Sequence, residues 1–160
     1  MSPTALDSGS ARLHPFVMIL VHATTVEIAG HGILIRGPSG SGKSDLALRL
    51  IQGGAQLVAD DQTELFPQGG RLAARAPQTI AGMIEVRGLG IVRLPYCAEV
   101  PLALVVDLVA SECIERLPEA RTAEFLGIFV PLMALAPFEA SAEAKVRLAM
   151  LSATRDIMRT

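Results

Sequence analysis

Residues 37–44 constrain the fold of this chain more than any other stretch. They match the pattern GxxxxGK[ST], follow the apolar run Ile33-Leu34-Ile35, and precede a segment with apolar residues at helical spacing. Glycines let backbone N–H groups turn toward phosphate oxygens, and a following helix adds the positive end of its dipole. A Gly/Ser-rich turn seldom combines these features, so we predict a P-loop for ATP in which Lys43 contacts the β- and γ-phosphates and Ser44 binds Mg²⁺. The predicted nucleotide-binding residues are Gly37, Pro38, Ser39, Gly40, Ser41, Gly42, Lys43 and Ser44.

Composition and charge limit the kind of protein. The chain has 160 residues, of which 51% are hydrophobic and 19% charged, and this suits one domain with its own core. The net charge of −2 gives no general attraction to nucleic acid or an anionic membrane. The apolar runs are too short to span a bilayer. We therefore expect no nucleic-acid partner and no membrane segment.

Two cysteines, Cys97 and Cys113, show neither metal-ligand nor CxxC spacing. A reduced, cytoplasmic setting is the expectation. Residues 1–15 are small and polar, without a basic flank and a long apolar core, and we expect a flexible leader there.

Local patterns predict the remaining elements of a single α/β domain over residues 16–160, with a mixed sheet and flanking helices. Two β-rich runs, 16–21 and 24–28, predict a strand pair at the start of the sheet. Turn residues 67–70 predict a hairpin, and Pro131 indicates that the last strand is an edge strand or begins near this residue. Further predicted strands cover 56–59, 101–109 and 130–135, and helices follow the loop and cover 140–157.

Three groups of polar residues are candidates for chemistry. Asp60 and Asp61 end a β-prone run, and their position after the loop favours a Walker B role over a solvated turn. Glu85 and Arg87 lie in the apolar segment 83–92, where charges are costly unless paired or used, and a structural pair between them stays an alternative. His22 lies between the first two β-rich runs, where a lone histidine is more often structural.

Four segments together resemble the catalytic domain of the HPr kinase/phosphorylase family, in its truncated proteobacterial form. They are Val21-His22, GPSGSGKSDLALRLI, QLVADD and IEVRGLGI, and the resemblance covers roughly residues 16–135. It implies an ATP- and Mg²⁺-dependent enzyme that phosphorylates a serine of HPr, a small phosphocarrier protein, and removes that group with inorganic phosphate. It also implies a homo-oligomer. The implied catalytic residues are His22, Lys43, Asp60 or Asp61, and Arg116 from a short ERL match, and the implied Mg²⁺ ligands are Ser44 and Glu85.

One segment departs from the family pattern. The family's VxPGRN-like segment, associated with phosphate-driven dephosphorylation, is replaced at 136–141 by Ala-Pro-Phe-Glu-Ala-Ser. Without its arginine and asparagine, we expect kinase activity to exceed dephosphorylation.

Two alternatives remain. One is a P-loop kinase of a small molecule, including a relative of nucleotide-dependent carboxykinases. The other is a non-catalytic nucleotide-sensing module. The two adjacent aspartates and His22 favour an enzyme, because a sensor needs no base.

Overall fold

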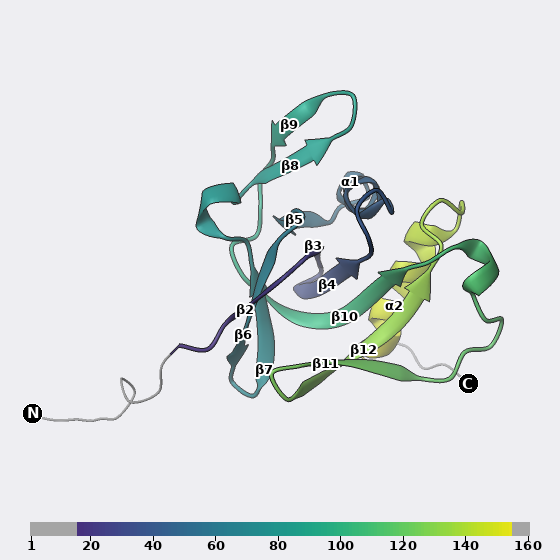
Figure 1. The fold of residues 1–160 in the computed structure, drawn as a ribbon. Helices are drawn as coiled ribbons and strands as arrows, with labels where there is room; N and C mark the ends of the chain where they lie inside the picture. Colours follow the sequence, from purple (N-terminus) through teal and green to yellow (C-terminus); the bar gives the residue numbers. More distant parts are fainter. Residues whose placement is uncertain (1–15, 155–160) are drawn as a thin grey trace, which may run out of the picture.

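A computed structural model describes residues 16–154 of the protein, and the predicted leader 1–15 and residues 155–157 of the predicted last helix lie outside this part. A nine-stranded mixed sheet forms its centre (Figure 1). Seven of its strands follow the order β2-β6-β7-β10-β4-β3-β5, and β12 pairs with β10 and carries β11. The strands are β2 (Ile19–Val21), β3 (Ala23–Ile28), β4 (His31–Arg36), β5 (Gln56–Ala59), β6 (Thr63–Gln68), β7 (Arg71–Arg75), β10 (Val100–Leu108), β11 (Arg121–Phe125) and β12 (Ile128–Leu135).

The parallel strands β4 and β10 place the phosphate loop. Leu104 pairs with Ile33 and Val106 with Ile35, and β12 continues the parallel pairing on the other side of β10. Side chains alternate along a strand, so Ile33 and Ile35 face one core while Leu34 faces another. The loop therefore follows a strand whose four central residues are buried, which gives it a rigid base.

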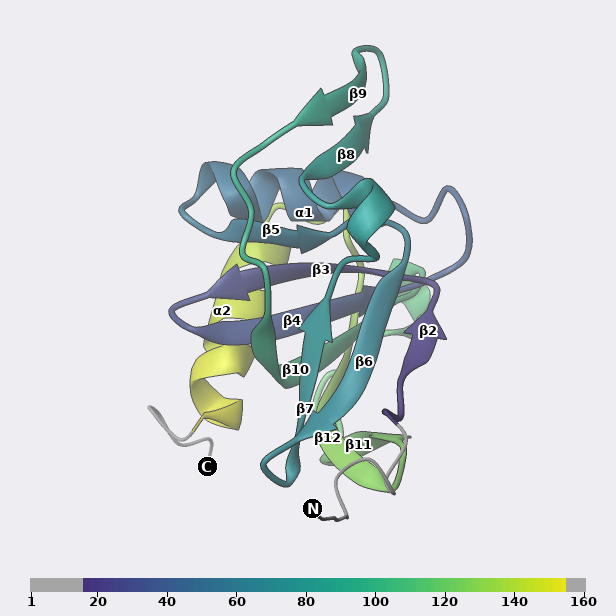
Figure 2. The same cartoon turned by 90° about the vertical axis from the view of Figure 1, so that its left-hand side faces the viewer.

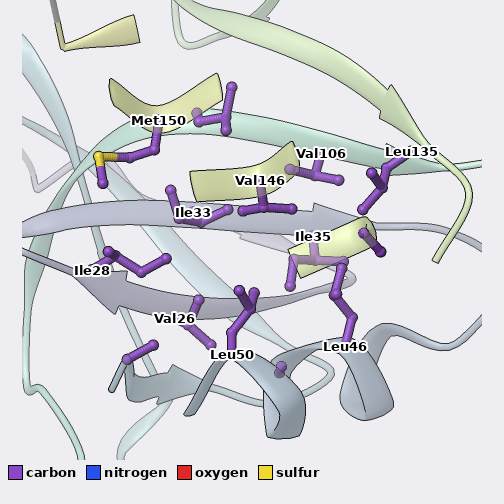
Figure 3. Close-up of a cluster of buried hydrophobic side chains, with 14 of the residues drawn as sticks. Val26, Ile28, Ile33, Ile35, Leu46, Leu50, Val106, Leu135, Val146 and Met150 are labelled. Atoms are coloured by element: carbon purple, nitrogen blue, oxygen red, sulfur yellow. The ribbon is translucent and has the colours of Figure 1, made fainter. Parts of the chain in front are cut away.

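Two helices cover one face of the sheet: α1 (Lys43–Gln52) and α2 (Ala142–Ala153). Leu46 and Leu50 of α1 meet Val146 and Met150 of α2 in a core over β3, β4 and β10 (Figure 3). The i, i+4 spacing in both helices puts these apolar side chains on one side, as predicted. The helix α1 ends at Gly53, whose N–H bonds back to the carbonyl oxygens of the last turn.

The sheet is curled, because the antiparallel strands β6 and β7 turn away from the direction of β4 and β3 (Figure 2). Different parts of its other face therefore pack against each other. The predicted hairpin of residues 63–74 is confirmed as β6 and β7. A second core fills this side, and it includes Leu34, Leu65, Leu72, Val105 and Val130.

A separate hairpin of β8 (Met83–Val86) and β9 (Gly90–Arg93) stands away from the main sheet beside α1 (Figures 1 and 2). Short 3-10 turns precede it at Gln78–Ile80 and follow β10 at Ser111–Cys113. Within residues 16–154, neither helix is long and apolar enough to cross a membrane.

Two expectations about strand pairing are wrong. The first two strands do not pair with each other: β2 pairs with β6, while β3 pairs with β4 and β5. Only His22 separates β2 from β3, which is too short for a hairpin turn. The strand β12 is not an edge strand, because it lies between β10 and β11. Its pairing with β10 begins at Leu132, so the missing N–H of Pro131 removes no hydrogen bond from that ladder.

The segment 83–92 also differs from the prediction of two charges buried among apolar residues. Glu85 and Arg87 are both exposed, so neither pays a desolvation cost. Among the residues described, no ion pair joins them. The structural Glu85–Arg87 pair is therefore absent here.

Candidate active site

The backbone of the glycine-rich loop adopts conformations that would be strained for residues other than glycine. Gly40 and Gly42 have φ angles of 80° and 101°, in the left-handed region. Gly42 is also the N-cap of α1, and no side chain caps the helix there. The N–H groups of the first helical turn are thus available to an anion at the positive end of the helix dipole.

Lys43 lies beneath this loop rather than in solvent. Its side chain is only 7% exposed, and Nζ donates hydrogen bonds to the carbonyl oxygens of Gly37 at 2.8 Å and Pro38 at 3.1 Å. An ammonium group held under the loop by these two carbonyl oxygens adds a full positive charge to the anion site.

Asp60 is a buried carboxylate that connects three elements. It is 7% exposed, and its Oδ1 accepts hydrogen bonds from Ser44 Oγ at 2.6 Å and Thr24 Oγ1 at 3.1 Å. Its Oδ2 accepts a bond from the backbone N–H of Glu85 at 2.9 Å. With both oxygens occupied, Asp60 fixes the Ser44 hydroxyl at the start of α1 and the position of β8 beside it.

Asp61 has the opposite surroundings, although it is the next residue. Its side chain is 63% exposed, and its Oδ1 lies 2.7 Å from His22 Nε2. Its φ of 70° is unusual for a residue other than glycine, and this turn points Asp61 away from Asp60. Backbone strain of this kind persists where the surrounding structure enforces it, often at functional sites. Here the Asp61 N–H donates to Thr24 Oγ1, which holds the turn.

A cavity of about 480 Å³ joins most of these groups. The loop and the start of α1 form one wall, the β8–β9 hairpin forms another, and Phe138 closes a third side. Its lining residues are Ser39, Gly40, Gly42, Lys43, Ser44, Asp45, Leu48, Asp61, Glu85, Val86, Arg87 and Phe138.

The lining fits a nucleotide with a divalent cation better than either alone. It contains three carboxylates, Asp45, Asp61 and Glu85, which would repel the polyphosphate of ATP. Within residues 16–154, no three His, Cys, Asp or Glu side chains are grouped so that protein alone could hold a metal. Mg²⁺ suits such a site, because it prefers oxygen ligands and usually shares its coordination between one or two protein groups, phosphates and water. The Ser44 hydroxyl and the Glu85 carboxylate are donors of this kind.

The structure does not bring every predicted residue into the cavity. Arg116 is exposed in the segment after the Ser111–Cys113 turn and does not line the cavity. Arg121, a second arginine in the same part of the sequence, is on β11 and does not line the cavity either.

Two positioning groups were missed by the sequence analysis. Thr24 is fully buried, donates a hydrogen bond to the Asp60 carboxylate and accepts one from the Asp61 N–H. The only feature in the sequence that pointed to this role was a hydroxyl group within a β-rich run. Arg36, the last residue of β4, forms a two-point ion pair with Asp107 of β10, at 2.7 and 3.0 Å. Asp107 follows an apolar run, which resembles a Walker B strand, yet its carboxylate pairs with Arg36 at the start of the loop.

The sequence matches a known protein family. The family described as HPr Serine kinase C-terminal domain matches residues 17–136. The chain belongs to this family. The sequence-based resemblance to HPr kinases is thereby confirmed.

Similar individual proteins are also named as HPr kinases. An HPr kinase/phosphorylase of Clostridium tetani is 48% identical over 75 residues, 47% of this chain and 25% of that protein. One of Clostridium beijerinckii is 49% identical over 72 residues, 45% of this chain and 24% of that protein. The chain therefore matches about a quarter of the length of these curated relatives.

A solved structure matches the fold more completely. The HPr(Ser) kinase/phosphatase of Coxiella burnetii superposes with a TM-score of 0.75 at 29% identity, covering 86% of this chain and 94% of that one. The α/β fold is thus confirmed as that of HPr kinases.

The segment 137–141 lies just beyond the part of the chain that matches the family. Glu139 in this segment forms an ion pair with Lys145 of α2, with Oε1 and Nζ 3.0 Å apart. The hydrogen bond and charge of Lys145 lower the pKa of the Glu139 carboxyl. Glu139 does not line the cavity, so it adds no direct repulsion to a bound anion there.

Proposed function

We propose that this protein is a Mg²⁺-dependent kinase that transfers the γ-phosphoryl group of ATP to a serine of an HPr-type phosphocarrier protein. The main support is the contrast between adjacent carboxylates beside the phosphate loop: Asp60 is buried against Ser44, whereas Asp61 faces the cavity beside His22. A nucleotide sensor needs no exposed base at this position. The curated relatives carry the name HPr kinase/phosphorylase.

The loop and Lys43 would hold the β- and γ-phosphates of ATP. Ser44 and Glu85 would hold Mg²⁺, and Asp60 would fix the Ser44 hydroxyl through their 2.6 Å hydrogen bond. Bound Mg²⁺ supplies charge neutralisation between the phosphates and the carboxylates of the cavity. The protein thus contributes mainly position and electrostatics, as in other phosphoryl transfers.

Asp61 is the proposed proton acceptor. The seryl oxygen of the carrier attacks the γ-phosphorus, the bond from that phosphorus to the β–γ bridging oxygen breaks, and the seryl proton moves to Asp61. ADP leaves with the bridging oxygen. His22 Nε2 orients the Asp61 carboxylate, whose exposure leaves a second oxygen open to the incoming hydroxyl. Arg116 stays a predicted catalytic residue whose position here gives it no contact with the cavity.

We also propose a cytoplasmic setting and a homo-oligomer. Both cysteines are free thiols, which agrees with a reducing compartment. The exposed apolar side chains Leu89 and Ile91 on the β8–β9 hairpin offer a surface that a second copy of the chain would cover.

The test is transfer of label from γ-labelled ATP to a purified HPr-type protein in the presence of Mg²⁺. The matched acceptor is the same carrier with its target serine changed to alanine. We expect label on the first carrier alone, and none when the enzyme carries Lys43→Met. Label on a small molecule would support the small-molecule kinase, and ATP binding without any transfer would support the sensor.

A further inference from the structure

We propose that Phe138 is the platform on which the base of the bound nucleotide stacks. This inference rests on the proposed function, because it assigns the base-binding end of the same ATP site. It concerns a residue just beyond the family match, where the chain departs from the family pattern.

Phe138 is exposed, although one edge of its ring contacts the phosphate loop. Its side chain is 72% exposed, a high value for a phenylalanine. A Cβ atom added to Gly42 would lie only 2.8 Å from Phe138 Cζ, so one edge of the ring rests on the N-cap of α1. The ring lines the main cavity and also a neighbouring one of about 300 Å³ on the other side of the loop.

The backbone under the ring is anchored, which suits a fixed platform. Ala136 and Pro137 are buried, and the Pro137 carbonyl oxygen accepts a hydrogen bond from Arg49 Nη2 of α1. Arg49 also pairs with Asp45 at 3.0 Å, and Glu139 pairs with Lys145 of α2. The backbone at Phe138 is thus tied to both helices, and little backbone freedom is lost when a ligand binds.

The cavity has two chemically different parts. Lys43, Ser44 and Asp61 provide the polar part, which suits the β- and γ-phosphates. Phe138, Leu48 and Val86 provide apolar surface. A nucleotide is polar at its phosphates and flat and apolar on the faces of its base.

Phe138 is the only aromatic residue among the residues that line this cavity. Its contact with Gly42 places it next to the first turn of α1. Stacking of a base on an aromatic ring is worth about 1–3 kcal/mol by alanine substitution, and it tolerates different bases because every base has a π-face.

The competing explanation is that the ring merely covers Gly42 and stiffens the loop. The two roles separate by ligand: a platform contributes only when a base is present, whereas a cover affects every phosphate ligand equally. Tripolyphosphate has the phosphates of ATP and no base, so it distinguishes them.

The experiment measures Kd by calorimetry for Mg²⁺-ATP and for Mg²⁺-tripolyphosphate with the wild type, Phe138→Ala, Phe138→Trp and Phe129→Ala. Phe129 is the matched control, because it is 64% exposed and lines neither cavity. We expect Phe138→Ala to weaken ATP binding by about ten-fold or more and to leave tripolyphosphate binding unchanged. Phe138→Trp should retain ATP affinity, and Phe129→Ala should leave the affinity for both ligands unchanged.

Three results would overturn the platform. These are wild-type ATP affinity in Phe138→Ala, an equal loss for ATP and tripolyphosphate, and a wild type that binds tripolyphosphate as tightly as ATP. If the ATP-specific loss is found but no label reaches the carrier protein, the platform stands and the proposed kinase function fails.

Discussion

The Nε2 atom of His22 lies 2.7 Å from Oδ1 of Asp61, although the two residues are 39 positions apart in the chain. The break between β2 and β3 provides the histidine, and the strained turn after β5 provides the aspartate. This contact gives His22 a partner beside the phosphate loop. A lone histidine between two strands therefore becomes part of a site through tertiary structure alone.

Lys43→Ala should abolish ATP-dependent phosphorylation. The ammonium group is nearly buried under the loop, and removing a positioned charge that stabilises a transition state costs on the order of 10²-fold or more in rate. Transfer of label to the carrier measures the loss. Lys43→Met keeps most of the apolar stem, and thermal unfolding by circular dichroism should show that both variants remain folded. Near wild-type transfer by a folded Lys43→Ala protein would disprove the P-loop assignment.

Forward transfer from ATP should be faster than phosphate-dependent dephosphorylation. In the reverse direction, inorganic phosphate must approach an anionic phosphoserine, and the two repel each other unless extra cations or N–H donors hold them. The segment 136–141 has no cation, and Arg121 lies outside the cavity. The measurement follows pyrophosphate release from phosphorylated carrier at millimolar phosphate, compared with forward transfer in the same buffer.

A reverse rate equal to the forward rate would show that this segment does not limit dephosphorylation. A Glu139→Arg variant places one cation in this segment, where the family pattern has an arginine, and so provides a gain-of-function comparison. We expect that variant to raise the reverse rate relative to the wild type.

Lys145→Gln should raise the pKa of Glu139 toward its ordinary value of 4.5, because the hydrogen bond and charge of Lys145 lower it. A carboxyl with a lowered folded pKa stabilises the fold above its unfolded pKa and loses that contribution as the pH falls through the folded value. The two proteins should therefore differ in the pH dependence of stability only below about pH 4.5. NMR titration of the Glu139 carboxyl measures the pKa directly. Arg147→Gln, a cation change on the same helix, should leave it unchanged.

Local sequence patterns predicted the elements of the fold better than their pairing. The helix α1 and the hairpin of β6 and β7 carry their own signals, in helical spacing and turn residues. β3 pairs with the next strand, β4, but β2 pairs with β6 and β3 also pairs with β5, and no local pattern specifies these later partners. Pro131 was a misleading signal, because a proline is tolerated where the neighbouring strand has not yet begun to pair.

The candidate site was predictable where a motif fixed it and not where packing decides. The loop residues and the aspartate pair follow from their spacing. The division between Asp60 and Asp61 does not, since it depends on Thr24 and on the turn at Asp61. Phe138 was also not predictable as a cavity residue, because its place beside Gly42 is a tertiary contact between segments far apart in the sequence.

The most direct test of Asp61 as the proton acceptor compares Asp61→Asn with Asp60→Asn. We would measure Mg²⁺-ATP affinity and single-turnover transfer to the carrier for each variant. Asp61→Asn should bind Mg²⁺-ATP like the wild type and transfer the phosphoryl group on the order of 10²-fold more slowly, because only the base is lost. Asp60→Asn should weaken Mg²⁺-ATP binding, because an amide has only one acceptor oxygen and cannot accept from both the Ser44 hydroxyl and the Glu85 N–H. Wild-type transfer by a nucleotide-saturated Asp61→Asn protein would contradict the proposed mechanism.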